Sequence, residues 1–166
     1  METSINKEPL KIGGWLIIIA IGIVITPFKL IYLMITTYPI IFKDGSWEAI
    51  TTKGNVAFSP FWEPLIITEI VINSILILLS IYLFYLFFAK QSCLPKWYFG
   101  TKLFSVLFIL VDAFIVTMIL PEMKIFDSET IKELASSLFG LFVWSPYLLY
   151  SQRSKLTFVN NKIPIT

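Results

Sequence analysis

The sequence contains no histidine and only one cysteine among its 166 residues. Histidine is the commonest general base and the commonest metal ligand in proteins, so other side chains would have to fill either role. A lone Cys93 excludes an internal disulfide, and without histidine it cannot form a Cys–His nucleophile pair. We therefore interpret Cys93 as an inert thiol and predict no metal site.

Charged residues are also scarce. They make up 14% of the chain, against about 25% in soluble domains. The net charge of +2 is small and the basic residues are spread along the chain, which excludes a typical nucleic-acid-binding surface. A Gly-rich phosphate loop, a Walker-type lysine and a GxSxG motif are missing as well. The sequence predicts no cofactor, and the question of enzymatic activity stays open, with non-enzymatic roles favoured.

Hydrophobic residues, in contrast, are abundant: they account for 57% of the chain, and the mean hydropathy is +0.81. They gather in four long blocks, each close to the roughly 20 residues that a helix needs to cross the bilayer. Strand-like alternation is absent, so each block is predicted to be helical. We predict an all-α, polytopic membrane protein that forms a single domain over residues 1–166. Its four transmembrane helices are expected at about 12–36, 60–89, 98–120 and 128–152, with an outer loop at 37–59 and a tail at 153–166.

The distribution of lysine and arginine predicts the orientation of the helices. Eight basic residues fall on the side of the two termini and four on the other side, which by the positive-inside rule places both termini in the cytoplasm. The eight are Lys7, Lys11, Lys90, Lys96, Lys102, Arg153, Lys155 and Lys162, and the four are Lys43, Lys53, Lys124 and Lys132.

The predicted outer loop is long and aromatic. Tyr38 and Trp47 are among its aromatic residues, and such residues often lie at the membrane interface. An aromatic belt on the bilayer is the favoured interpretation, and a ligand-binding lid is the alternative. Within the loop, residues 46–54 could form a short helix with Ser46 as its N-cap.

Three charged residues interrupt the apolar blocks: Lys29, Glu69 and Asp112. Counted along the predicted helices, they lie roughly 8–12 Å below the outer boundary. Intramembrane charges usually face the bundle interior and pair with one another. Lys29 is therefore the leading partner for Glu69 and Asp112 its competitor, and we expect one carboxyl group to be protonated or hydrogen-bonded to Asn73 or water. The set is either a polar pocket or an ion-pair network that fixes helix register.

Three motifs resemble those of a bacterial family of small four-helix inner-membrane proteins, domain of unknown function 2569. They are IGGWL at the first helix, ITEIVIN in the second, and the ending WSPYLLYSQRSKLTF. Ser154 stands where the family usually has valine. The resemblance implies the inner (plasma) membrane as location but no reaction. It draws attention to Gly13, Gly14, Trp15, Ser151, Arg153, Lys155, Thr157 and Phe158, beside Glu69 and Asp112.

The ending has a physical interpretation of its own. Arg153 and Lys155 follow the last helix, where basic residues meet anionic headgroups. An ordinary membrane anchor is the favoured interpretation, and a docking motif for a partner is the alternative. Gly13 and Gly14 would let the tail approach the first helix closely.

Three functions remain open. The first is non-enzymatic binding of a lipid, a membrane protein or a second copy of the chain. The second is a small transporter or proton-coupled permease unit that uses Lys29, Glu69 and Asp112. The third, ranked last, is a membrane enzyme that acts on lipid.

Overall fold

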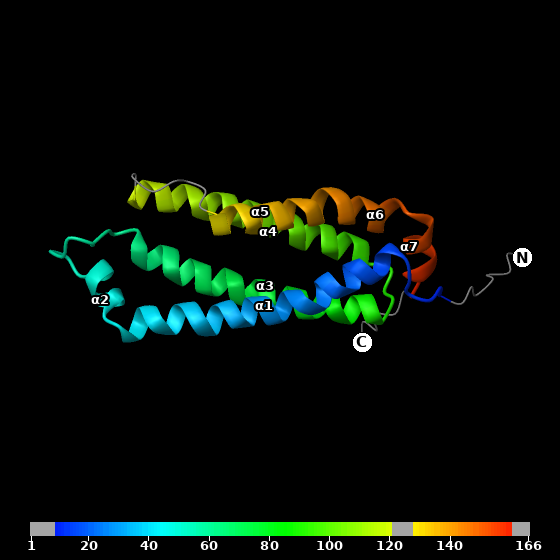
Figure 1. Cartoon of the computed structure of the whole chain (residues 1–166), viewed down its shortest axis with the longest axis horizontal. Coiled ribbons are helices and arrows are strands. Elements are labelled where there is room, and N and C mark those ends of the chain that lie inside the picture. Colours follow the sequence, from blue (N-terminus) through cyan, green and yellow to red (C-terminus); the bar gives the residue numbers. More distant parts are fainter. Residues whose placement is uncertain (1–8, 121–127, 161–166) are drawn as a thin grey trace, which may run out of the picture.

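The computed structural model describes residues 9–120 and 128–160, and this part of the chain is all-α (Figure 1). The only β-type pairing in these residues is an isolated bridge between Gln91 and Asn160. The predicted fold class is therefore confirmed as all-α. The elements are α1 (Trp15–Lys43), α2 (Ser46–Thr51), α3 (Trp62–Phe88), α4 (Leu94–Ile119), α5 (Ser128–Phe139), the π-helix η1 (Gly140–Trp144), α6 (Ser145–Tyr150) and α7 (Gln152–Thr157).

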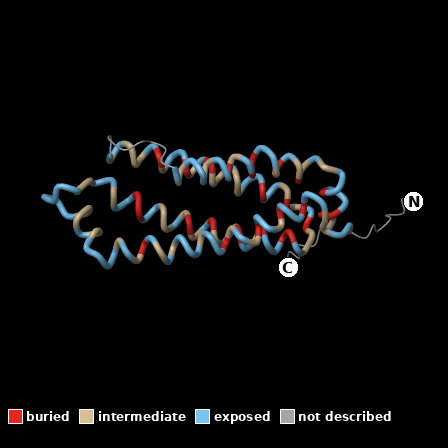
Figure 2. Tube along the Cα trace, viewed as in Figure 1, coloured by how far each residue is buried: buried red, intermediate tan, exposed pale blue. Residues whose placement is uncertain are grey.

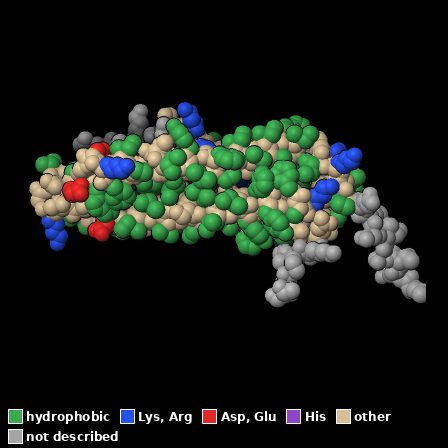
Figure 3. Space-filling model, turned by 90° about the horizontal axis from the view of Figure 1, so that it is seen from below, with side chains coloured by type: hydrophobic (Ala, Val, Ile, Leu, Met, Phe, Trp, Pro, Cys, Tyr) green, Lys and Arg blue, Asp and Glu red, His purple; other side chains and the backbone are tan. Residues whose placement is uncertain are grey.

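Three of these helices, α1, α3 and α4, are long and apolar enough to cross a membrane. Only 17–28% of the most apolar window of each is buried inside the protein, so most of these apolar side chains face outward, as lipid contact requires. Hydrophobic side chains cover most of the face in Figure 3, and the acidic side chains visible there lie at the α2 end. The expectation of transmembrane helices is confirmed for these three.

A fourth rod consists of α5, η1 and α6, which follow one another without a break from Ser128 to Tyr150. The π-helix lies immediately before Pro146, which has no N–H for a regular helical bond. The backbone N–H and side-chain hydroxyl of Ser145 both donate to the carbonyl of Gly140, the latter at 3.1 Å. The wider turn thus keeps its buried polar groups satisfied beside the proline.

The long helices pack in two layers: α1 against α3, and α5 and α6 against α4, with α3 and α4 joining the layers. Buried residues gather toward the end of the bundle that carries α7 (Figure 2). The main hydrophobic core lies there and includes Leu16, Ile19, Ile23, Leu83, Leu86, Phe87, Leu94, Tyr98, Leu148 and Phe158. The end that carries α2 is packed more loosely.

Backbone hydrogen bonds tie the two chain ends together. The Leu10 N–H donates to the Leu156 carbonyl at 3.0 Å, and the Asn160 N–H donates to the Lys90 carbonyl at 3.1 Å. Lys90 has a positive φ of 52° and forms the turn between α3 and α4. The described N-terminal residues, the end of α7 and this turn therefore meet at one end of the bundle.

The element bounds differ from the predicted ones in several places. Helix α1 ends at Lys43 rather than at 36, and α4 begins at Leu94 rather than at 98. The predicted tail contains helix α7. The short helix expected in the outer loop is present as α2, but Ser46 is its first residue and Gly45 occupies the N-cap position. Lys7, Lys124 and Lys162, which entered the orientation argument, lie outside the described residues.

Candidate functional site

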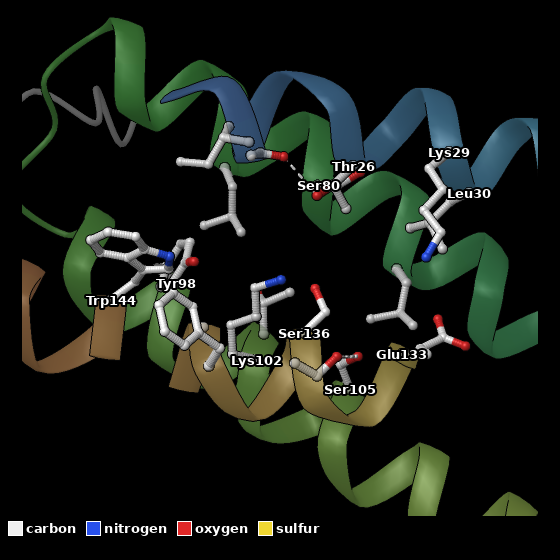
Figure 4. Close-up of a pocket in the computed structure, with 18 residues that line it drawn as sticks. Thr26, Lys29, Leu30, Ser80, Tyr98, Lys102, Ser105, Glu133, Ser136 and Trp144 are labelled. Atoms are coloured by element: carbon white, nitrogen blue, oxygen red, sulfur yellow. Dashed lines mark hydrogen bonds between the residues drawn. The ribbon is translucent and has the colours of Figure 1, made fainter. Parts of the chain in front are cut away.

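A cavity of about 220 Å³ lies between α1 and the α5–η1 part of the fourth rod, with α3 and α4 as its floor (Figure 4). Four of its lining residues, Gly22, Lys29, Ser136 and Phe139, are exposed and lie on α1 and α5. The cavity therefore opens on the side of the bundle, between these helices. Hydroxyl side chains dominate its polar lining: Thr26, Ser80, Tyr98, Thr101, Ser105, Ser136 and Ser137.

Lys102 of α4 extends into this cavity (Figure 4). Its side chain is mostly buried, and its Nζ lies 5.8 Å from the centre of the Tyr98 ring. No described residue forms an ion pair or hydrogen bond with this Nζ. An unpaired cation inside a membrane helix costs about 2.5–3.5 kcal/mol on insertion scales. The described residues thus give Lys102 a cation–π contact with Tyr98 but no counter-charge in direct contact with it.

Gly140 of η1 makes room for the Lys102 side chain. A Cβ at Gly140 would lie 3.0 Å from the Cδ and Cε atoms of Lys102, closer than ordinary van der Waals contact. π-Helical turns often occur at functional sites, and here the turn carries both Gly140 and the cavity-lining Trp144. The irregular turn therefore shapes one wall around the lysine.

Two further charged groups face the same space. Lys29 lies near the midpoint of α1 and is exposed at the mouth of the cavity, whereas Glu133 of α5 is partly buried on the opposite wall (Figure 4). Their charges are the ones that act on Lys102: Lys29 repels it and Glu133 attracts it. With all three groups ionised, the cavity would hold an excess of one positive charge.

A second polar cluster lies closer to the α2 end, around a cavity of about 200 Å³. The Tyr38 hydroxyl donates to Glu69 Oε2 at 3.2 Å and accepts from Asn73 Nδ2 at 3.0 Å. The Asp112 carboxyl group lies within hydrogen-bonding reach of Glu69, while its Oδ1 is buried without a hydrogen-bond partner. The two cavities share Leu76, Ser105 and Glu133 as lining residues.

The residues of the two end motifs meet at the α7 end. The guanidinium of Arg153 lies directly over the position where a Cβ of Gly13 would be, so only glycine leaves room for this conformation. Gly14 has φ +61° and ψ −139°, a combination that disfavours other residues. The backbone of the GGWL motif therefore forms the surface on which Arg153 rests.

The rest of the C-terminal motif builds and anchors α7. The Ser151 hydroxyl caps the helix by accepting from the Ser154 N–H at 3.1 Å, and the Thr157 hydroxyl donates to the Arg153 carbonyl at 2.8 Å. Phe158 is buried, with its ring 5.3 Å from that of Phe87. Lys155 is exposed. The motif thus has a structural part, which folds α7 onto the bundle, and an exposed basic part.

Comparison with known protein families shows which family the chain belongs to. A family model described as "Protein of unknown function (DUF2569)" matches residues 9–159. The chain belongs to the DUF2569 family. The match covers every described helix and both end motifs, so the resemblance predicted from the sequence is confirmed. No curated protein and no solved structure matches the chain.

The structure brings together part of the predicted polar set of this DUF2569 protein. Glu69, Asn73 and Asp112 share one cluster. Lys29, expected as the leading partner of Glu69, lies instead in the neighbouring cavity with Lys102. The physical reason is that α1 continues past the predicted end, so Lys29 lies at its midpoint, below the level of the acids. The aromatic partner Tyr38 comes from this extension.

Sequence reasoning missed three residues of the site. Tyr38 was assigned to the outer loop, Lys102 was counted with the basic residues on the side of the termini, and Glu133 was not singled out. A signal for Tyr38 exists, because it continues the spacing of the buried face of α1, Leu16, Ile19, Ile23 and Pro27. Trp15 of the GGWL motif is 60% exposed, and its ring centre lies 6.2 Å from that of Trp144 in η1.

The described residues offer little for a metal. Within residues 9–120 and 128–160, no group of three or more His, Cys, Asp or Glu side chains is placed to hold an ion. What the charged cavity can do chemically is bind: it presents ammonium and hydroxyl donors in a space that opens toward the side of the bundle.

Proposed function

We propose that this DUF2569 protein is a four-span protein of the bacterial inner membrane that binds a membrane-resident amphiphile without transforming it. The observation that carries the proposal is the charged cavity between α1 and the fourth rod, because its exposed lining faces sideways rather than toward either end. A ligand entering there would come from the bilayer.

The position of the chain ends supports an even number of membrane crossings. Leu10 is hydrogen-bonded to Leu156, so both described ends lie on the same side of the bundle. Three apolar helices alone would leave the ends on opposite sides. The fourth rod, with its 12, 5 and 6 residues, extends about 35 Å, which is enough to cross the hydrocarbon core.

The charges at the two ends support a cytoplasmic location for both termini. The α7 end carries five described basic residues and no described acid: Lys11, Lys90, Lys96, Arg153 and Lys155. The α2 end mixes both signs, with Asp44, Glu48 and Glu63 beside Lys43 and Lys53. The positive-inside rule then places the α7 end in the cytoplasm.

Labelling of single cysteines in intact cells tests this topology, after replacement of Cys93 by serine. A cysteine at Lys53 should react with an impermeant maleimide in whole cells, whereas a cysteine at Lys155 should react only after the membrane is opened. The reverse pattern, or labelling of both, would overturn the orientation or the count of four spans.

Native mass spectrometry of the protein released from its own membrane tests the binding. We expect an adduct of a few hundred daltons in the wild type. Gly22→Leu should abolish the adduct, because nothing lies within 4 Å of a Cβ at this cavity-lining position and the leucine would fill the mouth. Gly100→Leu is the matched control: it is equally unobstructed, lies on α4 and does not line the cavity. A bare wild-type chain, or an adduct equal in both variants, would refute binding in this cavity.

A second function, a proton- or ion-coupled transport unit, is favoured by one separate observation. The two cavities share lining residues, so polar groups continue from the Glu69 cluster toward Lys102. Proton flux in liposomes that is lost in Glu69→Gln would support this function. Equal flux with and without the protein would exclude it.

A further inference from the structure

The cavity around Lys102 contains polar groups without a described partner. Lys102 has no described ion-pair or hydrogen-bond partner, and the hydroxyl of the adjacent Thr101 is buried without one. Ser80 donates to its own helix, and Ser105 and Ser137 are bonded to each other. Unsatisfied donors of this kind call for an acceptor from outside the chain.

The charge of the cavity indicates the kind of acceptor. Lys29 and Lys102 face each other across a space that contains one carboxyl group, Glu133. With Glu133 ionised, a ligand group with a single negative charge would neutralise the site. A phosphodiester carries one such charge, and its oxygens accept charge-assisted hydrogen bonds from ammonium and hydroxyl groups.

The position of the cavity indicates where that phosphodiester comes from. Lys102 lies about 12 Å along α4 from its start at the α7 end, a depth within reach of a cytoplasmic-leaflet lipid. The route from the α7 end is narrowed by Trp15 against Trp144 and by the buried Tyr98. The side opening between Gly22 and Phe139 is lined by exposed residues, so acyl chains can remain in the bilayer while the headgroup enters.

We infer that the cavity between α1 and the α5–η1 segment is a binding site for the phosphodiester headgroup of an anionic phospholipid, held by Lys102 and Lys29. This inference rests on the proposed binding function and names its ligand. The volume of about 220 Å³ accommodates a phosphate and its nearest atoms, but not the acyl chains. Glu133, on the opposite wall, would disfavour ligands with a higher negative charge.

The test is lipid retention in nanodiscs that contain equal amounts of phosphatidylglycerol and phosphatidylcholine with the same acyl chains. Native mass spectrometry of the ejected protein measures which lipid stays bound. We expect the wild type and Gly100→Leu to retain phosphatidylglycerol at least tenfold over phosphatidylcholine. Lys102→Gln should lose this preference, and Glu133→Gln should increase it, because it removes the opposing negative charge. If Lys102 and Glu133 had a purely structural role, their two substitutions would not change the lipid preference in opposite directions.

Further measurements separate a failure of the phospholipid assignment from a failure of amphiphile binding itself. Lys29→Gln, at the exposed mouth, should also lower the preference at least severalfold, and it serves if Lys102→Gln fails to fold. Equal retention of both lipids in the wild type would overturn this inference while leaving amphiphile binding intact, and retention of neither would overturn both. Inorganic phosphate added to the delipidated protein forms the last arm. If phosphate alone raises the melting temperature in a Lys102-dependent way, the ligand is a soluble anion and the lipid assignment is wrong.

Discussion

The hydroxyl of Tyr38 is the centre of the acidic cluster, and Tyr38→Phe removes it while keeping the ring. Tyr38 is 7% exposed, so the phenylalanine should occupy the same space. The substitution deletes two hydrogen bonds, one donated to Glu69 at 3.2 Å and one accepted from Asn73 at 3.0 Å. Asn73 is itself buried and loses its only described acceptor.

The expected loss of stability follows from these two bonds. Side-chain hydrogen bonds in membrane proteins contribute about 0.6 kcal/mol on average and at most about 1.7. Two of them amount to roughly 1.2 kcal/mol, and an unpaired buried amide adds to this loss. We expect Tyr38→Phe to lower the free energy of unfolding by about 1–3 kcal/mol.

Unfolding by sodium dodecyl sulfate in mixed micelles, followed by circular dichroism, measures this change. Tyr32→Phe is the matched control, since Tyr32 is on the same helix and 67% exposed, with no described hydrogen bond to its hydroxyl. Its effect should stay within about 0.5 kcal/mol. A Tyr38→Phe effect no larger than that of Tyr32→Phe would refute the hydrogen-bonded arrangement.

Three further predictions concern other parts of the chain. Gly13→Val should displace the Arg153 side chain and speed tryptic cleavage after it; an unchanged cleavage rate would contradict the contact. Glu69 and Asp112 line the same cavity, and two carboxyl groups that share a site do not readily ionise together, so infrared spectra at neutral pH should contain a protonated carboxyl band that Asp112→Asn removes. The pKa of Asp44 is held below its ordinary value of 3.8 by hydrogen bonds from the start of α2. This stabilisation should be complete above that value and be lost as the pH falls through the lowered pKa, and hydrogen exchange of the α2 amides would detect the loss.

The long apolar blocks were sufficient to predict the helices, because few structures other than helices can bury their backbone in lipid. The expectation that Glu69 faces the bundle interior was also informative. Asn73 and Ser80 are buried and Glu69 is partly buried, as one inward face of α3 requires. Pattern on a single helix therefore carried over well to the structure.

The end of α1 was harder to predict. The predicted helix stopped at 36, where the apolar block was judged to end, and Pro39 also disfavours a helical conformation at Tyr38, the residue before it. In the structure α1 continues through both Pro27 and Pro39, and the hydrogen bonds of Tyr38 to α3 compensate for the local cost. Such compensation depends on a partner helix and is not visible in local sequence.

The pairing of Lys29 could not be predicted from depth alone. Counting residues from a predicted helix end gives the depth of a side chain in the membrane. It does not give the direction in which the side chain points, and it depends on where the helix actually ends. The shift of the α1 end lowered Lys29 relative to Glu69. Similarly, Lys102 and Glu133 lie in the first turns beyond predicted helix starts, where a small change of boundary moves a charge from a loop into the cavity.

The hydrogen bond between Leu10 and Leu156 has a consequence for biogenesis. A chain emerges from the ribosome N-terminus first, at about 5–20 residues per second, so Leu10 must wait for nearly the whole protein before its partner exists. The contact between the Arg153 side chain and Gly13 forms equally late. The contacts at the α7 end can therefore be completed only after α7 has been synthesised, and a chain truncated before α7 is expected to be more open to proteolysis at that end.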